Sequence, residues 1–421
     1  MSEIIIKNIS IGDELLIGQV INTNAAWLGE QLSNAGFQLD SVLTIGDSEQ
    51  AIMDTFESCM DADLVLVTGG LGPTADDITK PTVCKFFGTE LEFCQAAYDN
   101  IVSIFNRRGF QMSERNEGQA YLPKSCQYIP NTYGTAPCMW LEKNGVAFVF
   151  MPGVPYEMKG IFNDELLPRI KERFHSMPYE KRVIMTTGIG ESFLADKIKD
   201  WEKNLPDFLS LAYLPQYGMV RLRLSGRNEN ATLLNVTLDN EVKKLKSLIS
   251  EYIFAFEDKS IEHVVFDLLI NKGMTFASAE SCTGGNIAHV ITLIPGSSEI
   301  FKGIAVTYAT PMKTKVLGVS SEIIEKHTVV SQPVVEGMAK GVRDLMEADF
   351  GVATTGVAGP GGGTEESPVG TVWIGVASKK GVVSKRFNFG KDRENVINRA
   401  TIMAYEMLRE EILSYAENAE S

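Results

Sequence analysis

Three consecutive side chains with nucleophilic oxygen or sulfur atoms precede two glycines: Ser281, Cys282, Thr283, Gly284 and Gly285. Small and apolar residues lead into this stretch and an apolar segment follows it, a pattern that predicts strand, tight turn and helix. The glycines let the backbone approach a ligand closely, and the first N–H groups of the helix can bind an anion. The turn is therefore a candidate site of covalent catalysis. A polar cap on an ordinary helix is the alternative.

A serine nucleophile needs a base. The last third of the chain holds His263, His289 and His327, and none of them lies in a loop with other functional signals, so a Ser-His-Asp triad is possible but unsupported. Lys313 follows a predicted strand end and a turn, as a site residue would. Taken alone, it also fits a solvated charge on a helix.

A second loop, residues 356–363, contains five glycines in eight residues, more than a plain turn requires. Successive backbone amides there can form a nest for a phosphate, and Lys391, Arg393 or Arg399 can neutralise its charge. The alternative is a flexible surface hairpin.

Residues 1–172 predict another site. Predicted strands are each followed by acids: Asp13 and Glu14, then Asp47, then Asp76 and Asp77. Ligands bind beyond the carboxyl ends of such strands, and grouped carboxylates suit a hard cation. The loop after the third strand offers backbone amides for a phosphate, with Gly69, Gly70, Gly72 and Thr74 as candidates. The loop is neither a Walker A nor a Gly-x-Gly-x-x-Gly motif. A helix N-cap or solvated turn is the alternative for each aspartate.

The elements that position these groups form three predicted domains. Residues 1–172 and 258–421 alternate strands and helices and are predicted to be α/β domains with mostly parallel sheets, and residues 173–257 a small α+β domain. Arg221 and Arg223 share one face of a strand in the middle domain, but neither an aromatic platform nor a Gly-x-x-Gly loop accompanies them. A spacer or dimerisation role is preferred.

Bulk properties narrow the class of protein. The 421 residues are 44% hydrophobic and 22% charged, with a net charge of -15 and no Lys/Arg block, so a generic nucleic-acid surface is not expected. Six cysteines without a Cys-x-x-Cys pair indicate reduced thiols and argue against structural zinc. Without a signal-peptide pattern or a long apolar run, we expect a cytoplasmic protein with no membrane partner.

Four motifs in the first domain resemble the N-terminal domain of the CinA family: residues 12–18, 22–24, 69–79 and 151–158. That domain is similar in fold to the molybdopterin-binding MoaB/MogA family. The resemblance implies ADP-ribose pyrophosphatase activity with a divalent metal (Mg, Mn or Co). Asp47 and Asp77 match the two acidic positions of the MogA-like site, and Asp76 is the neighbouring candidate. Molybdopterin binding is the competing interpretation.

The last domain resembles the CinA C-terminal domain, a nicotinamide mononucleotide deamidase that uses no cofactor. The resemblance rests on residues 279–285, 295–298, 306–313, 330–335, 356–363 and 368–373. It implies Ser281 as nucleophile, Lys313 as base and Arg393 as the arginine for the substrate phosphate, with Arg399 as second choice. It also implies a homodimer. Further candidates for substrate binding are Thr283, Gly284, Gly285, Tyr308, Thr355, Gly356, Gly359, Gly361 and Gly362.

These expectations combine into one mechanistic hypothesis. Lys313, kept neutral by desolvation and nearby cations, takes the proton of Ser281, which attacks the carboxamide carbon of nicotinamide mononucleotide. Amides of the Gly284–Gly285 turn hold the oxyanion. Ammonia leaves, and water hydrolyses the ester to nicotinate mononucleotide. The alternative from another class is a molybdopterin-binding or competence-associated adaptor that binds nucleotides without turnover.

Overall fold

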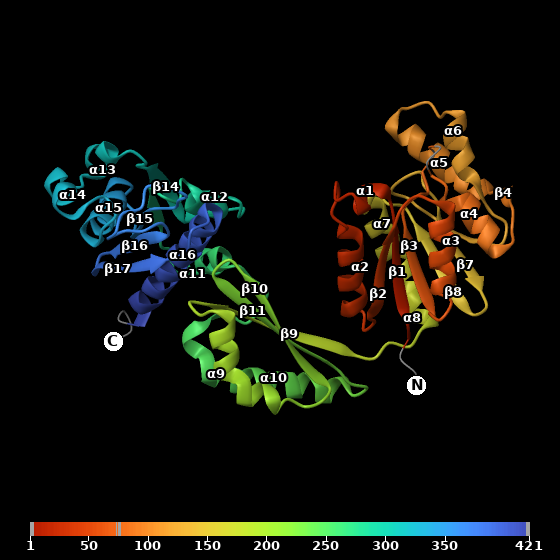
Figure 1. Ribbon diagram of the computed structural model, residues 1–421, viewed down its shortest axis with the longest axis horizontal. Helices are drawn as coiled ribbons and strands as arrows, with labels where there is room; N and C mark the ends of the chain where they lie inside the picture. The colour runs from red at the N-terminus through yellow and green to blue at the C-terminus, as the bar shows by residue number, and fades with distance from the viewer. Residues whose placement is uncertain (1–3, 73, 75–76, 418–421) are drawn as a thin grey trace. The chain divides into compact units, whose positions relative to one another are not determined.

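The computed structural model describes residues 4–72, 74 and 77–417 (Figure 1). The chain divides into two compact units. Unit 1 comprises Met1–Glu180 with Arg227–Leu234, and unit 2 comprises Lys181–Gly226 with Asn235–Ser421. Among the described residues, no helix combines the length and the apolar character that crossing a bilayer requires.

Unit 1 is built on a six-stranded sheet in the order β2-β1-β3-β8-β7-β6. Strands β2, β1, β3 and β8 are parallel, and β7 runs antiparallel to β8 and β6. The strands are β1 (Ile6–Ile11), β2 (Leu39–Ile45), β3 (Leu64–Thr68), β6 (Gln127–Ile129), β7 (Cys138–Lys143) and β8 (Val146–Met151). A separate two-stranded ribbon pairs β4 (Leu91–Phe93) with β5 (Tyr121–Pro123).

Alternation along the buried strand β3 explains the layered packing of unit 1. Val65 and Val67 contribute to one core with Phe56, whereas Leu64 and Leu66 contribute to another. Both faces are apolar because helices cover both sides, as is typical of a parallel sheet. The helices are α1 (Asp13–Leu16), α2 (Thr23–Asn34), α3 (Glu49–Ser58), α4 (Thr79–Phe87), α5 (Gln95–Arg108), α6 (Glu114–Glu117), α7 (Pro155–Ile161) and α8 (Leu167–Arg173), with a π-helical turn at Phe162–Leu166 between the last two.

Unit 2 begins with a four-stranded sheet in the order β10-β11-β9-β12. Its elements are β9 (Tyr179–Thr187), β10 (Leu209–Gln216), β11 (Met219–Arg227), β12 (Ile253–Ala255), α9 (Glu191–Lys203) and α10 (Ala231–Ile249). We call this part the middle module. Met185 and Phe254 of the module belong to the same hydrophobic core as Ile261 and Val265 of α11 (Ile261–Lys272). The middle module therefore shares a core with the rest of unit 2.

The remainder of unit 2 contains a five-stranded sheet in the order β14-β13-β15-β16-β17. Strands β14, β13 and β15 are parallel, whereas β16 and β17 extend the sheet as an antiparallel hairpin. The strands are β13 (Phe276–Glu280), β14 (Phe301–Val306), β15 (Phe350–Gly356), β16 (Thr371–Ser378) and β17 (Gly381–Asn388), and the further helices are α12 (Asn286–Thr292), α13 (Thr310–Leu317), α14 (Ser321–His327), α15 (Gln332–Leu345) and α16 (Arg393–Glu417).

Helices lie on both faces of this sheet as well. Ala277 and Ala279 of β13 pack in one core with Val335 and Met338 of α15. Phe276 of the same strand packs in the other core with residues of α11 and α16. The predicted α/β class is confirmed for both large domains. The sheets are parallel where the predicted sites lie and antiparallel at one edge.

Candidate active site

Three neighbouring strands bring the predicted catalytic segments to one edge of the sheet. Glu280, the last residue of β13, lies opposite Val306 of β14 and Thr354 of β15. The Ser281 turn, helix α13 and the 356–363 loop follow directly on these three strands. Parallel strands end at the same edge, so the three segments begin side by side.

Ser281 and Lys313 are in contact. The Nζ atom of Lys313 donates to Ser281 Oγ (3.1 Å) and to the Thr307 carbonyl oxygen (2.6 Å). Lys313 is 1% exposed, and burial lowers its pKa below the usual value for lysine. No carboxylate among the described residues forms an ion pair with it. This lysine is placed to serve as a base rather than as a surface cation.

The two residues after Ser281 are unsuited to act as the nucleophile. Cys282 is buried, and its burial raises the pKa of the thiol to about 12, so the reactive thiolate is suppressed. The hydroxyl of Thr283 donates to Glu280 Oε2 (2.7 Å) and shares a hydrogen bond with the Thr354 hydroxyl (2.7 Å). Of the three side chains in the turn, Ser281 is the one that contacts Lys313.

The amides predicted to hold the oxyanion are already engaged. Gly284 N donates to the Ser281 carbonyl (3.2 Å), and Gly285 N donates to Glu280 Oε2 (2.9 Å). That part of the prediction is wrong because the turn uses both donors internally. The amides of Cys282 and Thr283 find no acceptor within the described part of the chain. They are the available donors beside Ser281.

Arg393 ties together two of the predicted substrate-binding segments. Its guanidinium donates to the Gly359 carbonyl (2.7 Å) and to the Tyr308 hydroxyl (3.0 Å). The Tyr308 side chain is exposed and can meet a ligand. Within the described residues, the amides of five loop residues have no acceptor, which suits a phosphate nest; these residues are Ala358, Gly359, Gly361, Gly362 and Gly363.

Thr355 and Gly356 have positions that packing explains. The Thr355 hydroxyl is buried and donates to the Val329 carbonyl (2.8 Å). A Cβ atom on Gly356 would lie 2.6 Å from the Thr371 carbonyl oxygen of the neighbouring strand, so a side chain there would clash with the backbone. Both residues shape the start of the loop.

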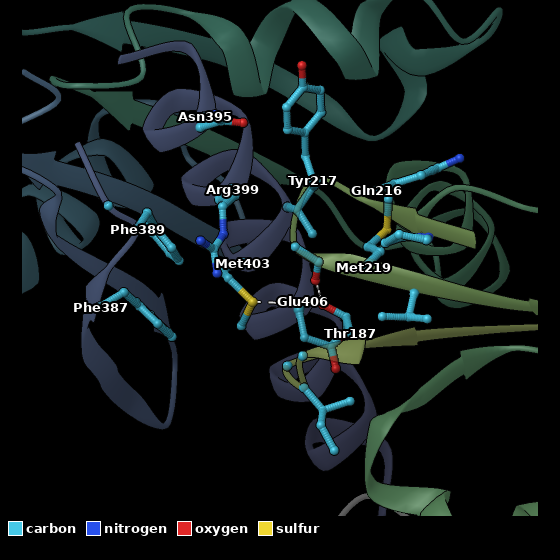
Figure 2. A pocket seen from close by; sticks show the side chains of 18 of the residues that line it. Thr187, Gln216, Tyr217, Met219, Phe387, Phe389, Asn395, Arg399, Met403 and Glu406 are labelled. Carbon is cyan, nitrogen blue, oxygen red and sulfur yellow. Dashed lines mark hydrogen bonds between the residues drawn. The ribbon is translucent and has the colours of Figure 1, made fainter. Parts of the chain in front are cut away.

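Arg399 lies in a different place from Arg393. It lines a cleft of about 1280 Å³ between the middle module and the α16 face, where its guanidinium stands 5.2 Å from the centre of the Phe389 ring. Figure 2 shows Phe387, Phe389, Arg399 and Met403 opposite Thr187 and Met219 of the middle module. No hydrogen bond in the described structure joins Arg399 to the Ser281 or Tyr308 segments. The cleft lining mixes three basic with five acidic residues: Lys385, Lys391, Arg399, Glu191, Glu251, Asp392, Glu406 and Glu410.

Sequence reasoning missed Glu280, whose carboxylate receives several hydrogen bonds from the turn. A charged residue at the end of an otherwise small and apolar strand was the available signal.

None of the hydrogen bonds described for His263, His289 or His327 reaches Ser281; His263 Nδ1, for example, pairs with the Ser260 hydroxyl (2.8 Å). A Ser-His-Asp triad is therefore not formed.

In unit 1, the predicted acids follow β1, β2 and β3. Asp13 N donates to Asp47 Oδ2 (3.0 Å), and Asp47 N donates to Asp13 Oδ1 (3.2 Å). The pKa of Asp47 is raised, first by burial and then by the nearby charges of Asp13, Glu14 and Asp77. Like charges are thus grouped at this edge of the sheet. Asp76 lies outside the described residues.

The predicted phosphate loop of unit 1 uses most of its own amides. Gly69 N donates to the Met151 carbonyl (3.2 Å), and Asp77 accepts from Gly72 N (2.8 Å) and Thr74 N (2.9 Å). Of the four predicted residues, Gly70 alone keeps an amide without an acceptor in the described chain. A Cβ on Gly69 would approach Ile11 O to 2.1 Å, so close strand packing explains this glycine.

A metal site is not assembled in the described part of unit 1. Within residues 4–72, 74 and 77–417, no three His, Cys, Asp or Glu side chains are gathered as metal ligands. Asp77 instead accepts hydrogen bonds from its own loop. The described side chains therefore do not form a complete ligand set, and no catalytic step is derived through a metal.

Comparison with known proteins identifies the family. Residues 258–412 match the model of the CinA C-terminal domain, and residues 7–172 match a model described as "Probable molybdopterin binding domain". A CinA-like protein of Flavobacterium psychrophilum is 44% identical over 411 residues, covering 96% of this chain and 98% of the relative. The chain belongs to the CinA family. The family predicted from the motifs is confirmed.

One further relative and one solved structure are also similar to this chain, over different lengths. A CinA-like protein of Cytophaga hutchinsonii is 40% identical and covers 96% of this chain and 97% of its own length. A solved structure, the competence/damage inducible protein CihA of Agrobacterium tumefaciens, is 34% identical over 37% of this chain and 97% of its own, with a TM-score of 0.35.

The middle segment has its own match. Residues 181–255 correspond to the model of the damage-inducible protein CinA KH domain, an assignment that sequence reasoning did not make. KH domains clamp a nucleic-acid backbone with a Gly-x-x-Gly loop. Residues 181–255 contain no such motif: the β9–α9 loop reads Gly188-Ile189-Gly190, and the acidic Glu191, the first residue of α9, stands where the second glycine of the motif would be. The missing second glycine hid the domain from pattern reading.

Proposed function

We propose that the C-terminal domain of this CinA protein is an amidohydrolase that converts nicotinamide mononucleotide into nicotinate mononucleotide and ammonia. The observation that carries the proposal is the 3.1 Å contact between Ser281 Oγ and the buried Nζ of Lys313. A serine next to a desolvated amine is a recognised arrangement of nucleophile and base.

In the first half-reaction, neutral Lys313 keeps an N–H directed at the Thr307 carbonyl and uses its lone pair to take the Ser281 proton. Ser281 Oγ then bonds to the carboxamide carbon. The resulting oxyanion receives hydrogen bonds from the Cys282 and Thr283 amides, and each such donor contributes about 10²–10³ in rate. The C–N bond breaks, and Lys313 returns the proton so that ammonia leaves.

In the second half-reaction, Lys313 takes a proton from a water molecule while the oxygen of that water bonds to the carbonyl carbon of the ester. Collapse of this intermediate breaks the bond to Ser281 Oγ and returns the proton to Ser281. Nicotinate mononucleotide is released, so atoms and protons balance without a cofactor.

Binding of the nucleotide phosphate is assigned to the loop that follows β15, the strand next to β13. The free amides of the 356–363 loop and the Arg393 guanidinium supply donors for the phosphate. The Tyr308 ring is exposed, and its hydroxyl accepts a hydrogen bond from Arg393, which also donates to Gly359 of the loop. It is assigned to contact the ribose or the nicotinamide ring.

Ammonia release from nicotinamide mononucleotide, with and without EDTA, tests the proposal. We expect release that is indifferent to the chelator and abolished in Ser281→Ala, while binding of the nucleotide persists. Binding without ammonia release by the wild type would favour the competing class, a nucleotide-binding adaptor. Activity in Ser281→Ala would show that another residue is the nucleophile.

A second activity is proposed for the N-terminal domain, divalent-metal-dependent hydrolysis of ADP-ribose to AMP and ribose 5-phosphate. The grouping of Asp47 with Asp13 at the carboxyl ends of β1 and β2 favours it, because a bound cation would offset the charge of these carboxylates. Burial, and then the charges of Asp13, Glu14 and Asp77, raise the pKa of Asp47. AMP release should require Mg²⁺, Mn²⁺ or Co²⁺, stop with EDTA and fall in Asp47→Asn. If AMP release survives EDTA, the metal-dependent activity is refuted.

We further propose a cytoplasmic homodimer with small nucleotides, rather than nucleic acid or membranes, as partners. Arg221, one of three basic residues on β11, forms an ion pair with Asp258 (2.7 Å). Together with the missing Gly-x-x-Gly loop, this argues against a phosphate-backbone surface on the middle module. A gel-shift assay with single-stranded RNA and DNA checks it, and salt-sensitive binding would overturn it.

A further inference from the structure

The Ser281 turn is fastened to a single buried side chain. Glu280 is 0% exposed, and its carboxylate accepts five hydrogen bonds. Oε2 accepts from the Thr283 hydroxyl (2.7 Å), Gly285 N (2.9 Å) and Ile287 N (3.2 Å). Oε1 accepts from Ala288 N (3.0 Å) and the Ser278 hydroxyl (3.2 Å).

These bonds connect the turn, the first residues of α12 and strand β13 through one carboxylate. Three of the five donors are backbone amides at the start of α12, which would otherwise have no acceptor. Glu280 thereby fills the position in which a ligand anion would be bound at a helix start.

The backbone of Glu280 contacts Thr307, whose carbonyl accepts a hydrogen bond from Lys313. Its carbonyl accepts from Thr307 N (3.0 Å), and the Thr307 carbonyl in turn accepts from Lys313 Nζ (2.6 Å). One residue therefore fixes the turn that carries the nucleophile through its side chain and the segment that holds the base through its main chain.

We propose that Glu280 is a positioning residue whose carboxylate fixes Ser281 Oγ against Lys313 Nζ and leaves the Cys282 and Thr283 amides free for the oxyanion. The inference rests on the proposed Ser281–Lys313 chemistry. A misplacement of about 1 Å at a reacting centre can cost on the order of 100-fold in rate.

Glu280→Gln tests this role with almost no change in shape. A glutamine amide has one acceptor oxygen and one donor NH₂ group, so in either orientation an NH₂ must face at least one of the backbone amides of α12. The turn must then shift to relieve the contact between donors.

Glu406→Gln is the matched control. Glu406 is also buried, at 4% exposure, and pairs with Arg409 on α16 (2.7 Å). Both variants remove a buried carboxylate from the same unit, so a general loss of stability should affect both. Only Glu280→Gln should affect the chemistry.

The experiment measures kcat and KM for nicotinamide mononucleotide, folding by circular dichroism, and the rate at which a fluorophosphonate labels Ser281, located by mass spectrometry. Folded Glu280→Gln should lose about 100-fold in kcat, as expected for a shift of about 1 Å, with little change in KM, and should label slowly. Glu406→Gln should keep the wild-type kcat. Folded Glu280→Gln with wild-type kcat and labelling rate would overturn the inference.

If Glu280→Gln fails to fold, Thr283→Val replaces it. This variant removes the hydroxyl between Glu280 and Thr354 and keeps the side-chain shape. A fall in kcat supports positioning, whereas a rise in KM alone, or no change, contradicts it. The labelling rate does not depend on the natural substrate. A wild type that labels at Ser281 but releases no ammonia would therefore refute the proposed deamidase and leave the positioning inference standing.

Discussion

Replacing Lys313 with methionine separates the charge of this residue from its shape. The side chain is 1% exposed, forms no ion pair in the described structure and has its pKa lowered by burial. Methionine matches the lysine side chain as far as Cε, lacks the amine and is neutral at every pH. The variant should affect both the rate and the way in which stability depends on pH.

The expected rate loss follows from removal of a general base. Such a base contributes about 10²–10⁴ in rate, or about 2.7–5.4 kcal/mol at 1.36 kcal/mol per tenfold. The measurement is kcat for ammonia release across a pH series. In the wild type, kcat/KM should rise as Lys313 loses its proton, and this limb should lie below the ordinary pKa of lysine. Lys313→Arg should also be inactive, because a guanidinium stays protonated.

The stability effect has a definite sign. Because the pKa of Lys313 is lowered in the folded state, the unfolded chain binds more protons than the folded chain between that lowered pKa and the ordinary lysine pKa of 10.5. Within that window, wild-type stability rises with pH, by about 1.4 kcal/mol per unit of pKa difference in total. Methionine removes this dependence. It also leaves the Thr307 carbonyl without its donor, at a cost of about 1–3 kcal/mol that does not vary with pH.

The test is therefore the difference in free energy of unfolding, variant minus wild type, from urea titrations at several pH values. We expect this difference to be most favourable to Lys313→Met near neutral pH and to become less favourable as the pH approaches 10.5. A difference that stays constant with pH would refute the assignment of Lys313 as a desolvated amine with a lowered pKa.

Two further predictions use matched substitutions. Cys282→Ala should keep deamidase activity, because the buried thiol with a pKa of about 12 contributes no nucleophile; loss of activity in the folded variant would reopen that assignment. Arg393→Ala should raise KM for nicotinamide mononucleotide, since it removes donors to Gly359 and Tyr308. Arg399→Ala, from the cleft of Figure 2, should leave KM unchanged. Equal effects on KM would contradict the separation of these two arginines.

The fold and the order of the site segments could be predicted because they depend on local patterns. Apolar strands such as Leu64–Thr68 indicate a buried parallel sheet, and polar loops directly after strands indicate its functional edge. The contact between Ser281 and Lys313 could be suggested only through the family resemblance, because 32 residues separate them in sequence.

The remaining details depend on which hydrogen-bond donors the chain satisfies for itself. The amides of Gly285 and Gly72 were reasonable anion ligands by sequence, yet Glu280 and Asp77 accept their hydrogen bonds. Whether a side chain of the protein or a ligand accepts from these amides depends on how the side chain folds back onto the backbone. Residue spacing in the sequence does not predict this. The match of residues 181–255 to a KH domain was missed for a different reason. This segment lacks the second glycine of the Gly-x-x-Gly motif by which a KH domain is recognised in a sequence.

Because the Glu280 carboxylate accepts from the amides at the start of α12, these amides are not available to the phosphate of the proposed substrate. A helix start and a Gly-Gly turn beside the nucleophile would compete for the substrate phosphate and draw it away from the productive position. With Glu280 accepting from Gly285, Ile287 and Ala288, the unengaged amides are those of Cys282 and Thr283 at the nucleophile and those of the 356–363 loop near Arg393. The two sets lie after neighbouring strands β13 and β15, so in the proposed reaction the oxyanion and the phosphate of one substrate would meet separate donors. Truncating the Glu280 side chain would free the amides of Gly285, Ile287 and Ala288 for an anion, so folded Glu280→Ala should be inhibited by inorganic phosphate more strongly than the wild type. Equal inhibition of the two proteins would refute this explanation.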